Sequence, residues 1–73
     1  MRISYDPSVD AAYIHLTDEA LIPGRYSIPC ETPEGVDAMV ILDWKNGRIT
    51  GIEVLGASHQ LHPDLLASAN PRE

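Results

Sequence analysis

The sequence is poor in cysteine and in aromatic residues. Its 73 residues include one cysteine, Cys30, no phenylalanine, three tyrosines and one tryptophan. A lone cysteine excludes a disulfide within the chain and fits a reducing compartment. A chain of this length buries only about 60% of the surface that its unfolded form exposes. It usually needs a disulfide, a metal or another subunit for stability, and here the disulfide is excluded.

Basic residues and long apolar runs are also scarce. The net charge is −6, and the five basic residues are scattered along the chain: Arg2, Arg25, Lys45, Arg48 and Arg72. Proteins bind nucleic acid mainly through Lys and Arg that neutralise phosphates, so we expect no direct nucleic acid partner. The longest apolar run, residues 38–42, is too short to span a bilayer, and no apolar leader opens the chain. We therefore expect a cytoplasmic protein without membrane contact.

Six prolines and five glycines divide the chain into short segments, which indicates one domain over residues 1–73, built from a sheet with turns. The strongest local signal is Asn46-Gly47 between two β-prone runs, because both residues tolerate the positive φ of a two-residue hairpin turn. This loop predicts the following pairs: Trp44 with Ile49, Asp43 with Thr50, Ile41 with Ile52, and Met39 with Val54. A longer loop with a bulge would shift the register, and Gly51 could absorb that shift.

Both faces of this predicted hairpin are apolar. In the register above, one face carries Met39, Ile41, Ile52 and Val54. The other face carries Val40, Leu42, Trp44, Ile49 and Leu55, with Glu53 opposite Val40. The run over residues 38–42 does not alternate between apolar and polar residues, and this pattern is typical of a strand that is covered on both sides.

The chain offers only one clear helix to cover these faces. It lies near residues 62–69, with Pro63 at its first position and Asp64 in its first turn. Its length of about two turns can cover one face at most. We therefore expect the second cover to come from another copy of the chain, as a homo-oligomer and most simply a dimer.

Two further strands are expected before this hairpin. Residues 25–30 alternate between apolar and polar, and Pro29 places their strand at a sheet edge because proline donates no ladder bond. At the start of the chain, Asp6 and Pro7 suit the first two positions of a turn. The resulting hairpin has these pairs: Asp6 with Ala11, Ile3 with Ile14, and Met1 with Leu16. A helix over residues 9–16, capped by Ser8, is the alternative.

The predicted fold is therefore α+β: a small antiparallel β-meander of about four or five strands, followed by one short C-terminal helix. In the first hairpin, Tyr13 and His15 point away from Ile14. We expect their face to meet the second subunit. The candidate interface or ligand-binding residues are Tyr13, His15, Val40, Leu42, Trp44, Ile49 and Glu53.

Two blocks, "YDPSVDAAYIHL" and "VILDWKNGRITGIEVLGAS", resemble a bacterial family of very short proteins of unknown function. Its members share a Y-D-x-x-x-D-x-x-Y-[IV] start and a D-x-x-G-x-[IV]-x-G-I-E-[IV]-L block. The matching positions are Tyr5, Asp6, Asp10, Tyr13 and Ile14, and then Asp43, Gly47, Ile49, Gly51, Ile52, Glu53, Val54 and Leu55. The resemblance implies no activity. Members occur beside other small proteins in operons, in the manner of antitoxins, which implies a small, basic, toxin-like partner encoded nearby.

The carboxylates offer a second interpretation of the function. Glu53 lies between apolar neighbours on a predicted central strand, where a carboxylate needs a partner. It could form the centre of a small-ligand or metal site with Asp6, Asp10 and nearby tyrosines or histidines. However, Asp6 and Asp10 also suit turns, where aspartate accepts backbone N–H groups, and their spacing lacks the dense acids of a calcium loop.

The remaining candidate groups favour a protein without catalytic residues. His59 and His62 have zinc-like spacing, but a zinc site needs at least three protein ligands, so His15 or Cys30 would have to converge on them. Cys30 has acidic neighbours rather than the basic ones that activate a thiolate. The sequence has no phosphate-binding loop or dinucleotide fingerprint. We therefore expect a non-enzymatic interaction module without a cofactor.

Overall fold

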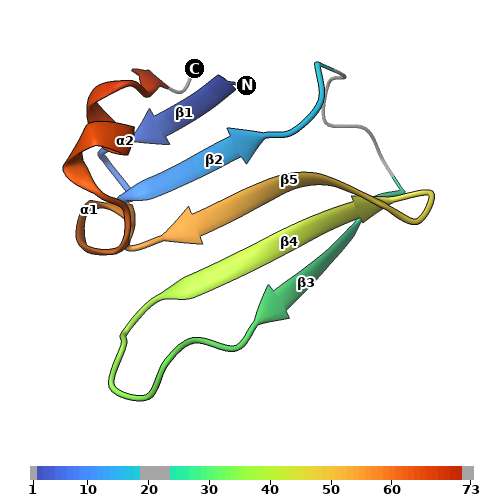
Figure 1. Cartoon of the computed structure of the whole chain (residues 1–73), viewed down its shortest axis with the longest axis horizontal. Coiled ribbons are helices and arrows are strands. Elements are labelled where there is room, and N and C mark those ends of the chain that lie inside the picture. The colour runs from blue at the N-terminus through green and yellow to red at the C-terminus, as the bar shows by residue number, and fades with distance from the viewer. Residues whose placement is uncertain (1, 19–23, 72–73) are drawn as a thin grey trace.

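The computed structural model describes residues 2–18 and 24–71, which form one mixed sheet with two short helices (Figure 1). The strands are β1 (Arg2–Asp6), β2 (Ala11–His15), β3 (Tyr26–Cys30), β4 (Met39–Lys45), β5 (Arg48–Leu55) and β6 (Asn70–Pro71). The helices are α1 (Ala57–Gln60) and α2 (Pro63–Ala67). The strand order is β3-β4-β5-β2-β1-β6, antiparallel except where β6 joins β1. The predicted α+β class with an antiparallel sheet is confirmed.

The first hairpin has the predicted register. Ile3 pairs with Ile14, and Asp6 pairs with Ala11. The alternative helix over residues 9–16 is wrong, and the predicted partner of Leu16, Met1, lies outside the described residues. The Asp6 carboxylate accepts bonds from the backbone N–H and the hydroxyl of Ser8, at 3.0 and 2.6 Å. This local bonding closes the turn between β1 and β2.

Asp10 joins this turn to the start of α1. Its backbone has a φ of 52°, and its carbonyl oxygen accepts the N–H groups of Gly56 and Ala57, at 2.9 and 3.0 Å. Its carboxylate accepts the N–H and hydroxyl of Ser58, at 2.9 and 2.7 Å, and the hydroxyl of Tyr5, at 2.7 Å. The bonds from Ser58 and Tyr5 hold the pKa of Asp10 below its usual value. One residue thus binds both the first hairpin and the first helix.

The second hairpin differs from its predicted register by one residue. Asn46 and Gly47 form the turn, with φ values of 52° and 76°, and Trp44 pairs with Ile49. A bulge then follows, so that Asp43 pairs with Gly51 and not with Thr50. Beyond the bulge the pairs are Leu42 with Ile52, Ile41 with Glu53, Val40 with Val54, and Met39 with Leu55.

The bulge changes which side chains share a face. A one-residue shift moves every later side chain of a strand to the other side relative to its partner. Glu53 therefore shares a face with Ile41 and Asp43, so its predicted position opposite Val40 is wrong. Asp43, rather than Glu53, is the buried carboxylate of this hairpin, with an exposed fraction of 3%.

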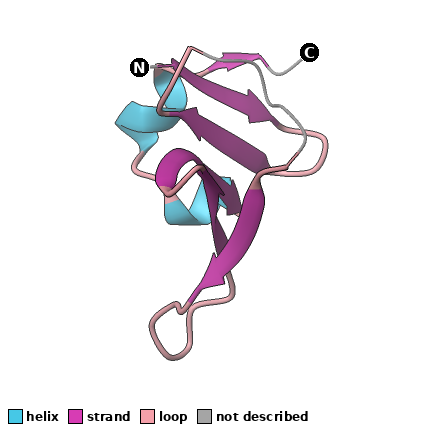
Figure 2. Cartoon of the chain, turned by 90° about the vertical axis from the view of Figure 1, so that its right-hand side faces the viewer, coloured by secondary structure: helices cyan, strands magenta, loops and turns pink. Residues whose placement is uncertain are grey.

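The two helices cover only one part of one face of the sheet. Ala57 of α1 packs with Ala12 of β2 and Val54 of β5, and Leu61 and Leu66 add to this cluster. Figure 1 shows both helices next to β1, β2 and the end of β5 and farther from β3, and Figure 2 shows them (cyan) in a view turned by 90°. Strand β3 lies at the sheet edge, as Pro29 predicted. Neither helix in the described part of the chain has the length and apolar character that a membrane crossing requires.

We expect Asp10→Asn to destabilise the fold in a pH-dependent way. Asparagine tolerates the positive φ but removes the charge. Because the folded pKa of Asp10 is lowered, the carboxylate's contribution is complete above the unfolded pKa of about 3.9 and is lost as the pH falls through the folded value. Urea unfolding of both proteins should show a difference at neutral pH that shrinks in acid. A difference that stays constant with pH would contradict this role, and Ser58→Ala should reproduce the effect.

Candidate functional site

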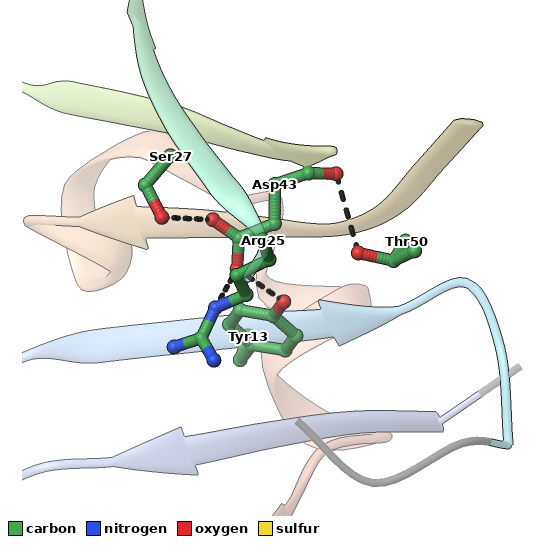
Figure 3. A network of polar contacts seen from close by, with 5 residues as sticks. All are labelled: Tyr13, Arg25, Ser27, Asp43 and Thr50. Carbon is green, nitrogen blue, oxygen red and sulfur yellow. Dashed lines mark hydrogen bonds and ion pairs between the residues drawn. The ribbon is translucent and has the colours of Figure 1, made fainter. Parts of the chain in front are cut away.

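The centre of the candidate site is the carboxylate of Asp43 on β4. It accepts the hydroxyls of Tyr13, at 2.5 Å, and of Ser27, at 2.6 Å, and pairs with the Arg25 guanidinium at 3.3 Å. Figure 3 shows the three side chains converging on this carboxylate: Tyr13 from β2, Ser27 from β3, and Arg25 from the position just before β3. The Thr50 hydroxyl donates to the backbone carbonyl of Asp43, at 3.3 Å. A buried carboxylate is tolerable here because both of its oxygens have partners.

The site lies on the face of the sheet opposite the helices. Val54 and Ile52 of β5 face the helices, so the alternation along the strand places Gly51 and Glu53 on the other side. The pairing places Tyr13 beside Glu53, and Asp43 beside Gly51, on this side. We call this surface the polar face.

Gly51 allows Tyr13 to reach Asp43. The two residues belong to β2 and β4, and β5 lies between these strands. A Cβ atom at position 51 would lie 2.1 Å from the Tyr13 hydroxyl oxygen, so only glycine leaves room for the ring to cross β5. Burial and the bond to Asp43 raise the pKa of Tyr13, so its phenol stays protonated and donates at neutral pH.

A second group of polar side chains adjoins Tyr13. The His15 ring contacts the Tyr13 ring edge-on, with centroids 4.7 Å apart. The Arg2 guanidinium lies 3.1 Å from Nδ1 of His15, and the Ser4 hydroxyl lies 2.9 Å from Nε2. A guanidinium can only donate, so Nδ1 accepts and, in the neutral ring, Nε2 carries the hydrogen. These contacts fix the His15 ring on the part of the polar face that β1 and β2 form.

The predicted site residues do not form one group. Tyr13, His15 and Glu53 lie on the polar face, with Tyr13 directly paired with Glu53. Val40 and Leu42 lie on the opposite face, with Val54 and Ile52. Trp44 and Ile49 pair next to the turn. The predicted grouping of Glu53 with Val40, Leu42 and Trp44 is therefore wrong.

Four residues of this network were missing from the predicted set: Arg25, Ser27, Asp43 and Thr50. Asp43 interrupts an apolar run between Leu42 and Trp44, which is the same signal that singled out Glu53. The bulge that places Asp43 opposite Gly51 could have drawn attention to it. Ser27 and Arg25 follow from the alternation of β3 only once its pairing with β4 is known.

The other candidate ligands are used locally. Asp6 and Asp10 bond within the first turn and at the start of α1, and Nδ1 of His62 accepts the backbone N–H of Asp64 at 3.1 Å, capping α2. In the ranges 2–18 and 24–71, no group of three or more His, Cys, Asp or Glu side chains could hold a metal ion. On the polar face, hydrogen bonds and an ion pair connect Asp43 with Tyr13, Ser27 and Arg25.

We expect Tyr13→Phe to destabilise the chain by about 2 kcal/mol, because it removes a donor from a buried carboxylate. The pKa of Tyr13 is raised in the folded state, so its contribution is complete below the unfolded pKa of about 10 and is lost as the pH rises further. Urea unfolding above a pH of about 10 should therefore show a smaller loss of stability in Tyr13→Phe than in the wild type. Tyr26→Phe, at an exposed tyrosine, is the control and should change little. Equal alkaline losses in all three proteins would refute this role for Tyr13.

Comparisons with known proteins give a family but no activity. No curated protein and no solved structure shows significant similarity to the chain. Residues 2–58 match the family described as a protein of unknown function, DUF2283. This range includes Tyr13, Gly51 and Asp43, together with Asp10 and Ser58. The chain belongs to this family of unknown function, DUF2283.

Proposed function

We propose that the chain is a non-enzymatic interaction module that works as a homo-oligomer, most simply a dimer. The observation that carries this proposal is an apolar surface on β3 and β4, on the helix side of the sheet, and not the face of Tyr13 and His15 where the sequence placed the second subunit. Tyr26 pairs with Trp44, Ile28 with Leu42, and Cys30 with Val40 on this side. Tyr26 and Ile28 are 71% and 54% exposed. We call Tyr26, Ile28, Val40, Leu42 and Trp44 the open apolar surface.

The size of the exposed surface supports a second copy as its cover. The chain exposes 5265 Å², whereas a compact monomer of 8.0 kDa exposes about 4,450 Å². The excess of about 800 Å² equals the area that each partner buries in an interface of standard size. Among the described residues, no large side chain is fully buried, so the core within one chain is thin. Burial against a second copy would add the missing apolar contacts.

The chemistry of β3 favours contact through its face rather than its edge. Pro29 donates no backbone bond, which weakens any attempt to extend the sheet from this edge. The five residues of the open apolar surface carry no charge, so two copies can meet there without burying a charged side chain, despite the net charge of −6. A two-fold arrangement would place the same residues of both copies against each other.

We expect the wild type to sediment as a dimer at micromolar concentration and Ile28→Asp to sediment as a monomer, because the new carboxylate would be buried in the interface. Val9→Asp is the matched control. Val9 is also apolar and 65% exposed, but it lies in the turn between β1 and β2. This variant should remain a dimer. A monomeric wild type at this concentration would end the proposal.

A small basic partner, of the kind that antitoxins bind, is the second candidate. The loop over residues 31–38 joins β3 to β4 and exposes Glu31, Glu34 and Asp37. These three charges adjoin the open apolar surface and suit a basic protein. The product of a neighbouring gene should then co-purify with this chain, and the neutral variant E31Q/E34Q/D37N should lose it. Binding that the neutral variant and added salt leave unchanged would exclude this candidate.

The third candidate, a small-ligand or metal site centred on Glu53, has less support. The carboxylates that were to join Glu53 are occupied elsewhere: Asp6 bonds to Ser8, and Asp10 bonds to Ser58 and Tyr5. Of the proposed set, only Tyr13 pairs with Glu53, and its hydroxyl donates to Asp43. The interaction module therefore remains the preferred function.

A further inference from the structure

We propose that Asp43 positions Tyr26 for contact with the second copy, an inference that rests on the dimer proposed above. Tyr26 is the most exposed aromatic side chain of the open apolar surface. Large aromatic residues of this kind contribute much of the energy of protein interfaces. Both sequence neighbours of Tyr26 bind one carboxylate: Arg25 at 3.3 Å and Ser27 at 2.6 Å from Asp43.

The contacts that hold β3 to β4 and the exposed side chain of Tyr26 lie on opposite faces of β3. Ser27 pairs with Asp43 on the polar face, so the alternation places Tyr26 on the opposite face, paired with Trp44. The backbone on both sides of Tyr26 is thereby tied to β4, while the ring itself remains exposed. Asp43 thus acts on the interface through the backbone of β3 and does not contact the partner's surface.

Asp43 itself accepts a hydrogen bond from a residue near the centre of the sheet. The Tyr13 hydroxyl donates to it across Gly51, at 2.5 Å, so the bonds run from β2 over β5 to β4 and on to β3. Strand β3 needs such side-chain bonds, because it lies at the edge and pairs with a neighbouring strand on one side only. An anchor that is ordered before binding loses less conformational entropy on association. The network on the polar face therefore strengthens a contact on the opposite face.

A double-mutant cycle of the full chain tests this coupling, with the dimer dissociation constant measured by sedimentation. We expect Tyr26→Ala to weaken the dimer about 30-fold, as for a central aromatic anchor. Ser27→Ala should weaken it about tenfold in the wild type, through loss of one charge-assisted bond. In the Tyr26→Ala background, Ser27→Ala should change the constant by less than about twofold, because there is no ring left to position. A merely structural role for Ser27 would weaken both backgrounds equally.

Two conservative variants serve as controls, and the fluorescence of Trp44 gives an independent signal for dimer formation. Ser27→Thr keeps the hydroxyl and should retain the wild-type constant. Thr50→Val removes a hydroxyl that, among the described residues, donates to the backbone carbonyl of Asp43 and not to its carboxylate, and it should leave the constant unchanged. Trp44, the only tryptophan, pairs with Tyr26, so its fluorescence should report dimer formation directly.

The outcomes separate this inference from the proposed function. A wild type that stays monomeric at micromolar concentration overturns both. If Tyr26→Ala weakens the dimer but neither Ser27→Ala nor Arg25→Gln does, only the positioning role of Asp43 is overturned. A dimer that Tyr26→Ala leaves intact also overturns it. Arg25→Gln removes the other contact beside Tyr26 and replaces Ser27→Ala in the cycle if that variant does not fold by circular dichroism.

Discussion

The sheet depends on a buried carboxylate whose main donor comes from two strands away. A carboxylate without partners at the position of Asp43 would lose several kcal/mol of hydration. Three donors must therefore reach it together: Tyr13, Ser27 and Arg25. Tyr13 can do so only across a glycine at position 51. Asp43, its three donors and Gly51 lie on β2, β3, β4 and β5 or next to one of these strands. Pairing this buried charge therefore fixes the order and the register of these four strands.

The same reasoning explains the residues that carry the family resemblance. Asp6 closes the first turn, and Asp10 binds both Tyr5 and the start of α1. Tyr13 and Asp43 hold the sheet together. Each of these side chains has a partner within the fold, so these positions of the two sequence blocks contribute to how the chain folds.

The sequence predicted those elements whose signal is local. Alternation and a turn with favourable residues were enough for the pairing of Ile3 with Ile14, and Pro29 was enough for the edge position of β3. The bulge beside Thr50 could not be placed from a two-residue period, since one inserted residue leaves the apolar pattern intact on either side. That single residue decided whether Asp43 or Glu53 is the buried acid. Helix α1, with four residues, is too short to show a helical period.

In the proposed dimer, this arrangement would also link folding to assembly. The helices cover the sheet over β1, β2 and β5, and leave Tyr26 and Ile28 of β3 exposed on the same side. An edge strand has a partner strand on one side only, yet Ser27 and Arg25 bind the carboxylate on which the centre of the sheet depends. Loss of that carboxylate would therefore loosen the centre of the sheet and the exposed edge together. Because one group serves both, the surface of the proposed dimer would form only when the polar face is complete.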